Sequence, residues 1–208
     1  MRNLPDNVEI HWTSLLVPSN PEELTAEEKD SVSRFVTPEL RRRALVSRVF
    51  LKRILARKLG VDSLDLRFSF GKFGKPYLAN ADFHFNLSHS GEMAVCAVSS
   101  NPVGIDVEET REDLDYADIS NHHFLPSERR KLDRDRFYRI WTAKEAFLKG
   151  LGEGLSTDLL SVEIVLGEGD ALSLASRTPN GEGWELFGIS QPGYRGTVAL
   201  RRNSMPSA

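Results

Sequence analysis

The chain has 208 residues, 40% hydrophobic and 27% charged, with a formal net charge of −3 and one cysteine. These values are typical of one globular domain or two small halves, and they exclude a disordered or fibrous chain. The single cysteine, Cys96, excludes a disulfide framework and a cysteine zinc cluster and favours a cytoplasmic protein. The slight negative charge argues against nucleic acid as a partner, and no apolar run reaches the roughly 20 residues of a membrane span. We therefore expect a soluble enzyme or binding module.

The first hundred residues predict a strand, two helices and then more strands. Thr25 and Glu28 form a capping-box pattern, Pro38 suits the first position of a longer helix, and Gly60 stops that helix. The expected elements are a strand over 8–12, helices over 26–35 and 38–59, weak alternation over 64–70, a turn over 71–76, and strands over 83–87 and 93–98.

The rest of the chain predicts a strand, a helical segment and several short strands. Pro126 and Ser127 begin helical sequence that is broken near Asp133 and continues to Lys149. The other expected elements are a strand over 103–108, irregular chain over 109–125, a loop over 150–154, short strands over 162–166, 172–175, 184–188 and 197–201, and a frayed tail over 203–208.

A weak internal repeat raises the question of a duplicated fold. Each half contains a strand, a long helix and further strands in that order, as a two-fold duplication would give. Three matched residues could also arise by chance, so unrelated halves stay open at this point. The matches, 102 positions apart, are Phe85 with Phe187, Ser88 with Ser190, and Gly91 with Gly193.

The predicted strand over 103–108 carries two acids. Because strand residues alternate between faces, Asp106 and Glu108 share one face with Gly104, roughly 6–7 Å apart. Two like charges so placed repel unless a cation joins them, and oxygen ligands suit Mg²⁺. An ordinary solvated strand face is the alternative.

Glu145 and Lys149 lie one helical turn apart and therefore share a helix face. Glu145 could add a third carboxylate to Asp106 and Glu108, and Lys149 could then meet a phosphate beside the metal. The glycine-rich loop that follows would let a ligand approach the backbone closely. A surface ion pair along the helix is the alternative.

Two other segments invite a phosphate or nucleophile interpretation. The loop 71–76 contains Lys72 and Lys75, but its spacing and Pro76 exclude a Walker loop; its lysines could still hold a phosphate, and a basic hairpin turn is the alternative. We reject a serine nucleophile at Ser88, because neighbouring strand residues point to opposite faces and His89 cannot easily serve it as a base. His89 could instead hold a phosphate.

The segment 126–150 is basic. It holds eight basic and four acidic residues, a balance of +4 within a chain of −3. That asymmetry suits an acidic partner, and an exposed solubilising helix is the alternative.

Four motifs together indicate a family. Their joint order closely resembles the 4′-phosphopantetheinyl transferases of the Sfp type, and the resemblance runs from about Phe35 to Leu155. The last two motifs are highly specific. In chain order they are Phe-Gly-Lys-Pro-Tyr-Leu at 73–78, Phe-Asn-Leu-Ser-His-Ser-Gly at 85–91, Gly-Ile-Asp-Val-Glu at 104–108, and Trp-Thr-Ala-Lys-Glu-Ala-Phe-Leu-Lys at 141–149.

The resemblance implies an α+β fold of two similar halves related by a pseudo-two-fold axis, here 1–100 and 101–208, with the active site in the cleft between them. It implies transfer of the 4′-phosphopantetheine arm from coenzyme A to a serine of an apo acyl or peptidyl carrier protein. The reaction depends on Mg²⁺ and releases adenosine 3′,5′-bisphosphate. We expect a monomer.

The resemblance also implies roles for individual residues. Asp106, Glu108 and Glu145 match the metal ligands, Glu145 is the candidate base for the carrier serine, and Lys149 matches the lysine at the pyrophosphate. Arg43 and His89 are expected to hold the 3′-phosphate of coenzyme A. The residues matching the segments around the nucleotide are Lys75, Pro76, Leu87 and Ser88.

Two departures qualify these expectations. Some relatives carry lysines before Phe35 that reach the 3′-phosphate, whereas 26–30 here is mostly acidic, so either Lys29 substitutes or Arg43 and His89 suffice. The linker between 108 and 141, a carrier-contact region in the family, is short. A different Mg²⁺-dependent phosphotransferase or pyrophosphatase, or a coenzyme A or carrier-binding module without catalysis, are the competing interpretations.

Overall fold

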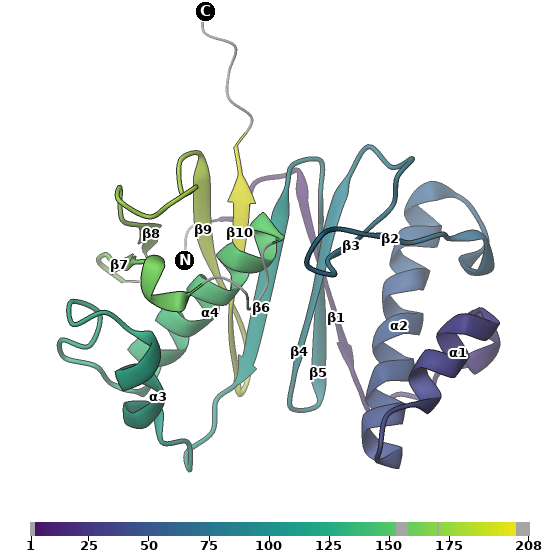
Figure 1. Cartoon of the computed structure of the whole chain (residues 1–208), viewed down its shortest axis with the longest axis horizontal. Helices are drawn as coiled ribbons and strands as arrows, with labels where there is room; N and C mark the ends of the chain where they lie inside the picture. Colours follow the sequence, from purple (N-terminus) through teal and green to yellow (C-terminus); the bar gives the residue numbers. More distant parts are fainter. Residues whose placement is uncertain (1–2, 153–157, 170, 203–208) are drawn as a thin grey trace, which may run out of the picture.

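The structure is a computed structural model that describes residues 3–152, 158–169 and 171–202 (Figure 1). The end of the expected loop at 150–154 and the expected frayed tail at 203–208 lie outside the described residues. No helix in the described part of the chain is long and apolar enough to cross a membrane.

The first half is a three-stranded antiparallel sheet with helices beside it. The capping box is confirmed, since Thr25 and Glu28 each bond the other's backbone N–H, and Gly60 ends α2 with a φ of 69°. The sheet has the order β1-β5-β4. The elements are β1 (Val8–Ser14), α1 (Ala26–Ser33), α2 (Pro38–Leu59), β2 (Ser69–Phe70), β3 (Pro76–Tyr77), β4 (His84–Ser90) and β5 (Met93–Ser99).

The second half repeats this plan. Its antiparallel sheet has the order β6-β10-β9, and β7 pairs with β8 in a small separate sheet. The elements are β6 (Val103–Glu109), α3 (Tyr116–His123), α4 (Arg134–Leu151), β7 (Ile164–Leu166), β8 (Leu172–Leu174), β9 (Trp184–Gln191) and β10 (Tyr194–Arg201).

Three sequence expectations are wrong in this half. The segment 109–125 contains α3, which begins where the Asp115 side chain accepts the N–H of Asp118, and its apolar residues pack on α4. The segment 126–131 forms turns rather than helix, and α4 begins only after Asp133, whose side chain accepts the N–H of Arg136. The expected loop at 150–154 also starts late, because Gly150 and Leu151 belong to α4.

The duplication is confirmed at the level of topology. In each half a strand, a long helix and a hairpin follow one another, and the first strand pairs with the last strand of the hairpin. The two hairpin strands β4 and β9 end at Ser90 and Gln191, 101 positions apart, so the residue match at 102 is one residue out of step with the turns.

The core lies in layers between the helices. In Figure 1, α1 and α2 lie on one side and α3 and α4 on the other, with the main strands between them. Strand alternation places Cys96 and Val98 of β5 toward α2, while Val95 and Ala97 join Ile105 of β6 in a core that the two sheets share.

The two halves meet where β4 lies against β6, each an edge strand of its own sheet. No backbone ladder joins the two strands. Instead, side chains of β4 accept backbone N–H groups of β6, and we call these three bonds the side-chain ladder. Asn86 Oδ1 accepts from Ile105 N at 2.8 Å, Ser88 Oγ from Val107 N at 3.4 Å, and Ser90 Oγ from Glu109 N at 3.1 Å.

Candidate active site

A glycine lets α4 touch β6. A Cβ atom at Gly104 would lie 2.0 Å from the Ala146 carbonyl oxygen and 2.3 Å from the Gly150 nitrogen, both in α4, so a side chain is excluded there. The close approach brings Glu145 and Lys149 of α4 to the strand face that carries Asp106 and Glu108, as the strand and helix periodicities predict.

Asp106 is the buried centre of this cluster, with 2% of its surface exposed. Its Oδ1 accepts the Ser88 hydroxyl at 2.9 Å and pairs with the Lys149 ammonium at 2.5 Å. The ammonium also donates to Ser88 Oγ at 3.0 Å. Burial raises the pKa of Asp106, and Lys149 and Ser88 oppose that rise because they stabilise the carboxylate.

Glu108 lies two residues further along β6. Its Oε2 accepts the Ser90 hydroxyl at 2.6 Å, and a hydrogen bond from Trp141 also stabilises its charged form. Burial and the charge of Asp106 raise the pKa of Glu108 against these bonds. Sequence reasoning gave Ser90 and Trp141 no role; the two-residue period shared by β4 and β6 was the available signal.

Glu145 adds a third carboxylate from α4. Burial, then repulsion from Asp106, raises the pKa of Glu145, while Lys149 lowers it. Two carboxylate oxygens, Glu145 Oε1 and Asp106 Oδ2, are buried without a hydrogen-bond partner among the described residues. Unpartnered buried oxygens are costly, and a bound cation or a donated proton would satisfy them.

The oxygen atoms of Asp106, Glu108 and Glu145 are of the kind that binds Mg²⁺, but the three carboxylates do not converge on one point in this structure. Within the described residues, no three or more His, Cys, Asp or Glu side chains lie closely enough together to hold a metal ion. Lys149 supplies the positive charge at Asp106 in this arrangement. Carboxylate oxygens suit hard cations such as Mg²⁺. The assignment of these three residues as metal ligands stays a prediction.

Arg43 of α2 lies near enough to His89 of β4 for its charge to act on the imidazole, and its Nη1 pairs with Glu39 at 3.8 Å. Burial, followed by the positive charges of Arg43 and Lys149, lowers the pKa of His89. The Nε of Arg43 is buried without a partner among the described residues. These groups together suit an anion. Lys29 is engaged elsewhere, since its ammonium pairs with Glu22 at 2.8 Å.

Lys75 ties the two halves together. Its ammonium donates to the carbonyl oxygens of Val103 and Gly150, each at 3.0 Å, and burial lowers the pKa of Lys75 to about 8. The backbone around Lys75 and Pro76 lines a cavity of about 720 Å³ that reaches the end of α4. Pro76 also borders a second cavity of about 400 Å³, with Leu87.

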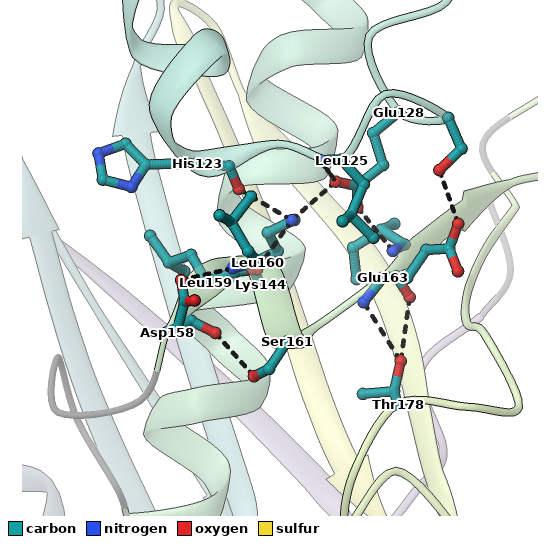
Figure 2. A network of polar contacts seen from close by, with 12 residues as sticks. His123, Leu125, Glu128, Lys144, Asp158, Leu159, Leu160, Ser161, Glu163 and Thr178 are labelled. Atoms are coloured by element: carbon teal, nitrogen blue, oxygen red, sulfur yellow. Dashed lines mark hydrogen bonds and ion pairs between the residues drawn. The ribbon is translucent and has the colours of Figure 1, made fainter.

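Lys144, next to Glu145 in α4, is fully buried (Figure 2). Its ammonium pairs with Glu128 at 2.7 Å and donates to the carbonyl oxygens of His123 at 3.1 Å and Leu159 at 3.0 Å. Lys144 therefore cannot belong to an exposed basic face. The exposed basic residues of the turn before α4 are Arg129, Arg130 and Lys131, and the Arg129 guanidinium donates to Asn121.

Comparison with known proteins gives the same family for both halves. A family model described as the 4′-phosphopantetheinyl transferase superfamily matches residues 102–199, and one for the N-terminal part of a 4′-phosphopantetheinyl transferase matches 19–101. The chain is 31% identical to 4′-phosphopantetheinyl transferase Sfp of Bacillus subtilis, covering 88% of this chain and 84% of that one.

Two further relatives carry the same description. A 4′-phosphopantetheinyl transferase of Bacillus subtilis is 35% identical, over 73% of this chain and 70% of its own. The transferase HetI of Nostoc is 38% identical, over 69% of this chain and 65% of its own. These similarities cover most of the chain, including the segments that carry Asp106, Glu108, Glu145 and Lys149. The chain therefore belongs to the 4′-phosphopantetheinyl transferase superfamily.

Proposed function

We propose that this enzyme transfers the 4′-phosphopantetheine arm of coenzyme A to a serine hydroxyl of an apo acyl or peptidyl carrier protein. The observation that carries the proposal is the convergence of Asp106, Glu145 and Lys149 at the junction of the two halves. Two buried carboxylate oxygens there lack partners among the described residues. The site lies in the cleft between residues 1–100 and 101–208, and the approach of β4 to β6 supports this division.

The carboxylates divide between metal binding and proton transfer. Asp106, Glu108 and Glu145 would hold Mg²⁺, which supplies charge neutralisation at the pyrophosphate when bound. Glu145 accepts the proton of the carrier serine at its unpartnered Oε1, directly or through a water. The serine oxygen forms a bond to the phosphorus that bears pantetheine, the pyrophosphate bond breaks, and adenosine 3′,5′-bisphosphate leaves.

The basic residues bind the nucleotide part of coenzyme A. Lys149 lies beside Asp106 and stabilises the negative charge of the departing phosphate. Arg43 and His89 bind the 3′-phosphate, a role supported by the unpartnered Nε of Arg43. The second cavity, bordered by Pro76 and Leu87, lies on the same side of β4 as α2 and accepts the nucleoside. Lys75 and Ser88 shape the site through the bonds already described.

The decisive experiment is intact-mass analysis of several apo carriers after incubation with coenzyme A and Mg²⁺. Wild-type protein is expected to add one phosphopantetheine mass to at least one carrier. Asp106→Ala should lower kcat by more than about a hundredfold, since it removes a group that acts at the developing charge. Its near-ultraviolet circular dichroism should match that of wild type.

An exposed-acid variant outside the 108–141 linker, Asp65→Ala, is the matched control and should keep full activity. Activity of Asp106→Ala in excess chelator would contradict the metal assignment. Loss of coenzyme A without any carrier present would favour a different Mg²⁺-dependent phosphotransferase or pyrophosphatase. The sequence also predicts a monomer in the cytoplasm. Size-exclusion chromatography tests the oligomeric state, and cell fractionation tests the location.

A further inference from the structure

Two members of the side-chain ladder between β4 and β6, Ser88 and Ser90, also donate hydrogen bonds to carboxylates of β6. Residues 88 and 90 of β4 face residues 106 and 108 of β6, with the same two-residue period on both strands. Ser88 donates to Asp106 at 2.9 Å, and Ser90 donates to Glu108 at 2.6 Å. Each serine hydroxyl therefore accepts one backbone N–H of β6 and donates to one carboxylate of β6.

Hydroxyl chemistry makes this arrangement directional. A serine hydroxyl has one hydrogen to donate and two lone pairs with which to accept. At Ser90 the accepted bond from Glu109 N leaves the single hydrogen for Glu108 Oε2, which fixes where the carboxylate oxygen lies. At Ser88 both lone pairs are used, because Lys149 and Val107 N both donate to it.

We infer that Ser90 is a positioning residue for the transfer reaction. From the N-terminal half it holds Glu108 of the C-terminal half in the orientation that metal binding requires, and Trp141 approaches the same carboxylate from α4. Without the hydroxyl, Glu108 loses its one strand-borne donor and turns away from the repelling charge of Asp106. This inference rests on the proposed function for its meaning in catalysis.

The test compares Ser90→Ala and Ser90→Thr with Ser190→Ala. Ser190 lies near the turn of the second hairpin, and its hydroxyl has no hydrogen-bond partner among the described residues. Ser90→Ala should lower kcat roughly tenfold to a hundredfold and weaken Mg²⁺ binding by a similar factor in calorimetry without coenzyme A or carrier. The KM for coenzyme A should change less than about twofold. Ser90→Thr, which keeps the hydroxyl, should recover both quantities, and Ser190→Ala should behave as wild type.

Two results would overturn the role of Ser90. Wild-type kcat and Mg²⁺ affinity in Ser90→Ala overturn the inference, as does a Ser90→Thr variant as impaired as Ser90→Ala. If Ser90→Ala does not fold, as judged by thermal unfolding in chelator, a folded and active Ser90→Thr supports the inference, and an inactive one overturns it. A wild-type protein that binds Mg²⁺ but modifies no carrier refutes the proposed function, while calorimetry still decides the role of Ser90.

Discussion

Arg43 carries a buried guanidinium nitrogen without a partner among the described residues, close to His89. We expect Arg43→Ala to weaken binding of coenzyme A about tenfold to a hundredfold, since bonds to charged groups contribute roughly 1.5–3 kcal/mol. Dephospho-coenzyme A, which lacks the 3′-phosphate, should bind equally well to both proteins. Isothermal calorimetry with the two ligands measures the difference.

Arg41→Ala is the matched control for that measurement, because the Arg41 guanidinium bonds the Phe35 carbonyl at 2.7 Å instead of facing His89. It should leave both affinities unchanged. Equal losses for the two ligands in Arg43→Ala would contradict the 3′-phosphate assignment.

Lys75 makes the stability of the fold depend on pH in the alkaline range. Burial lowers its pKa from 10.5 to about 8, so between these values the unfolded chain binds the proton more readily than the folded chain. Stability contributed by this group therefore rises as pH increases from about 8 to 10.5, and below about 8 the cost of the buried charge is complete. The two carbonyls that accept from the ammonium limit that cost.

Urea unfolding of wild type and Lys75→Met should show this dependence. The free energy of unfolding of wild type, relative to the variant, is expected to be larger at about pH 10 than at about pH 7.5. A difference that is independent of pH would show that Lys75 keeps an ordinary pKa in the folded protein, and one that falls at high pH would show that folding raises its pKa.

At the scale of elements, a buried ion pair of α4 connects the helix to the chain segments before and after it. The buried Lys144–Glu128 pair fixes segments that no main sheet includes: Glu128 accepts the N–H of Leu125 and of Ile164, each at 2.8 Å. Figure 2 shows how this one pair collects backbone groups from both sides of α4. The pair therefore anchors the chain on either side of the helix that supplies Glu145.

Removing one partner should cost more than removing both. Lys144→Met leaves a buried carboxylate unpaired and should lower the free energy of unfolding by roughly 3–5 kcal/mol. Adding Glu128→Gln to that variant should recover part of the loss, because the uncompensated charge is gone. Urea unfolding of the single and double variants decides, with Lys131→Met as the exposed-lysine control. A double variant less stable than Lys144→Met would show that Glu128 acts mainly through its backbone bonds.

The sequence predicts a helix or strand correctly where the contacts that stabilise it join residues close together in the chain. The capping box at Thr25, Pro38 at the start of α2 and the alternation that aligns Asp106 with Glu108 depend on residues a few positions apart. The helix α3 was missed because the polar residues before Asp115 masked its cap. Other contacts join residues far apart in the chain, and no local pattern predicts them. Examples are the Ser90–Glu108 bond, 18 positions apart, and the Lys144–Glu128 pair, 16 positions apart.

At the scale of the whole molecule, Arg129, Arg130 and Lys131 form an exposed basic turn before α4, whereas the carboxylates of β6 bond Ser88, Ser90 and Lys149. We expect Arg129→Glu, Arg130→Glu and Lys131→Glu together to raise the KM for carrier and flatten its salt dependence. Surface charges act mainly on the encounter rate and are screened over about 8 Å at physiological salt. The KM for coenzyme A should stay constant. Steady-state kinetics at several salt concentrations measures both.

A triple variant that loses coenzyme A affinity and keeps its carrier KM would assign this basic turn to the nucleotide. Reversing charge on the exposed first turns of α2 by Arg41→Glu gives the matched control, since that helix lies on the opposite side of the molecule (Figure 1). It should leave the carrier KM unchanged.

The side-chain ladder is one-sided, and this has a consequence for the substitutions that the protein tolerates. The strand β6 contributes backbone N–H groups, which every amino acid except proline provides. The strand β4 contributes side chains, so only small polar residues satisfy positions 86, 88 and 90. In a saturation library selected for activity, we expect tolerance at 109 to most residues but proline, and a stripe of intolerance at every second position of β4. The permitted sequence variation would thus show that, in these three bonds, β4 supplies side chains and β6 supplies backbone N–H groups.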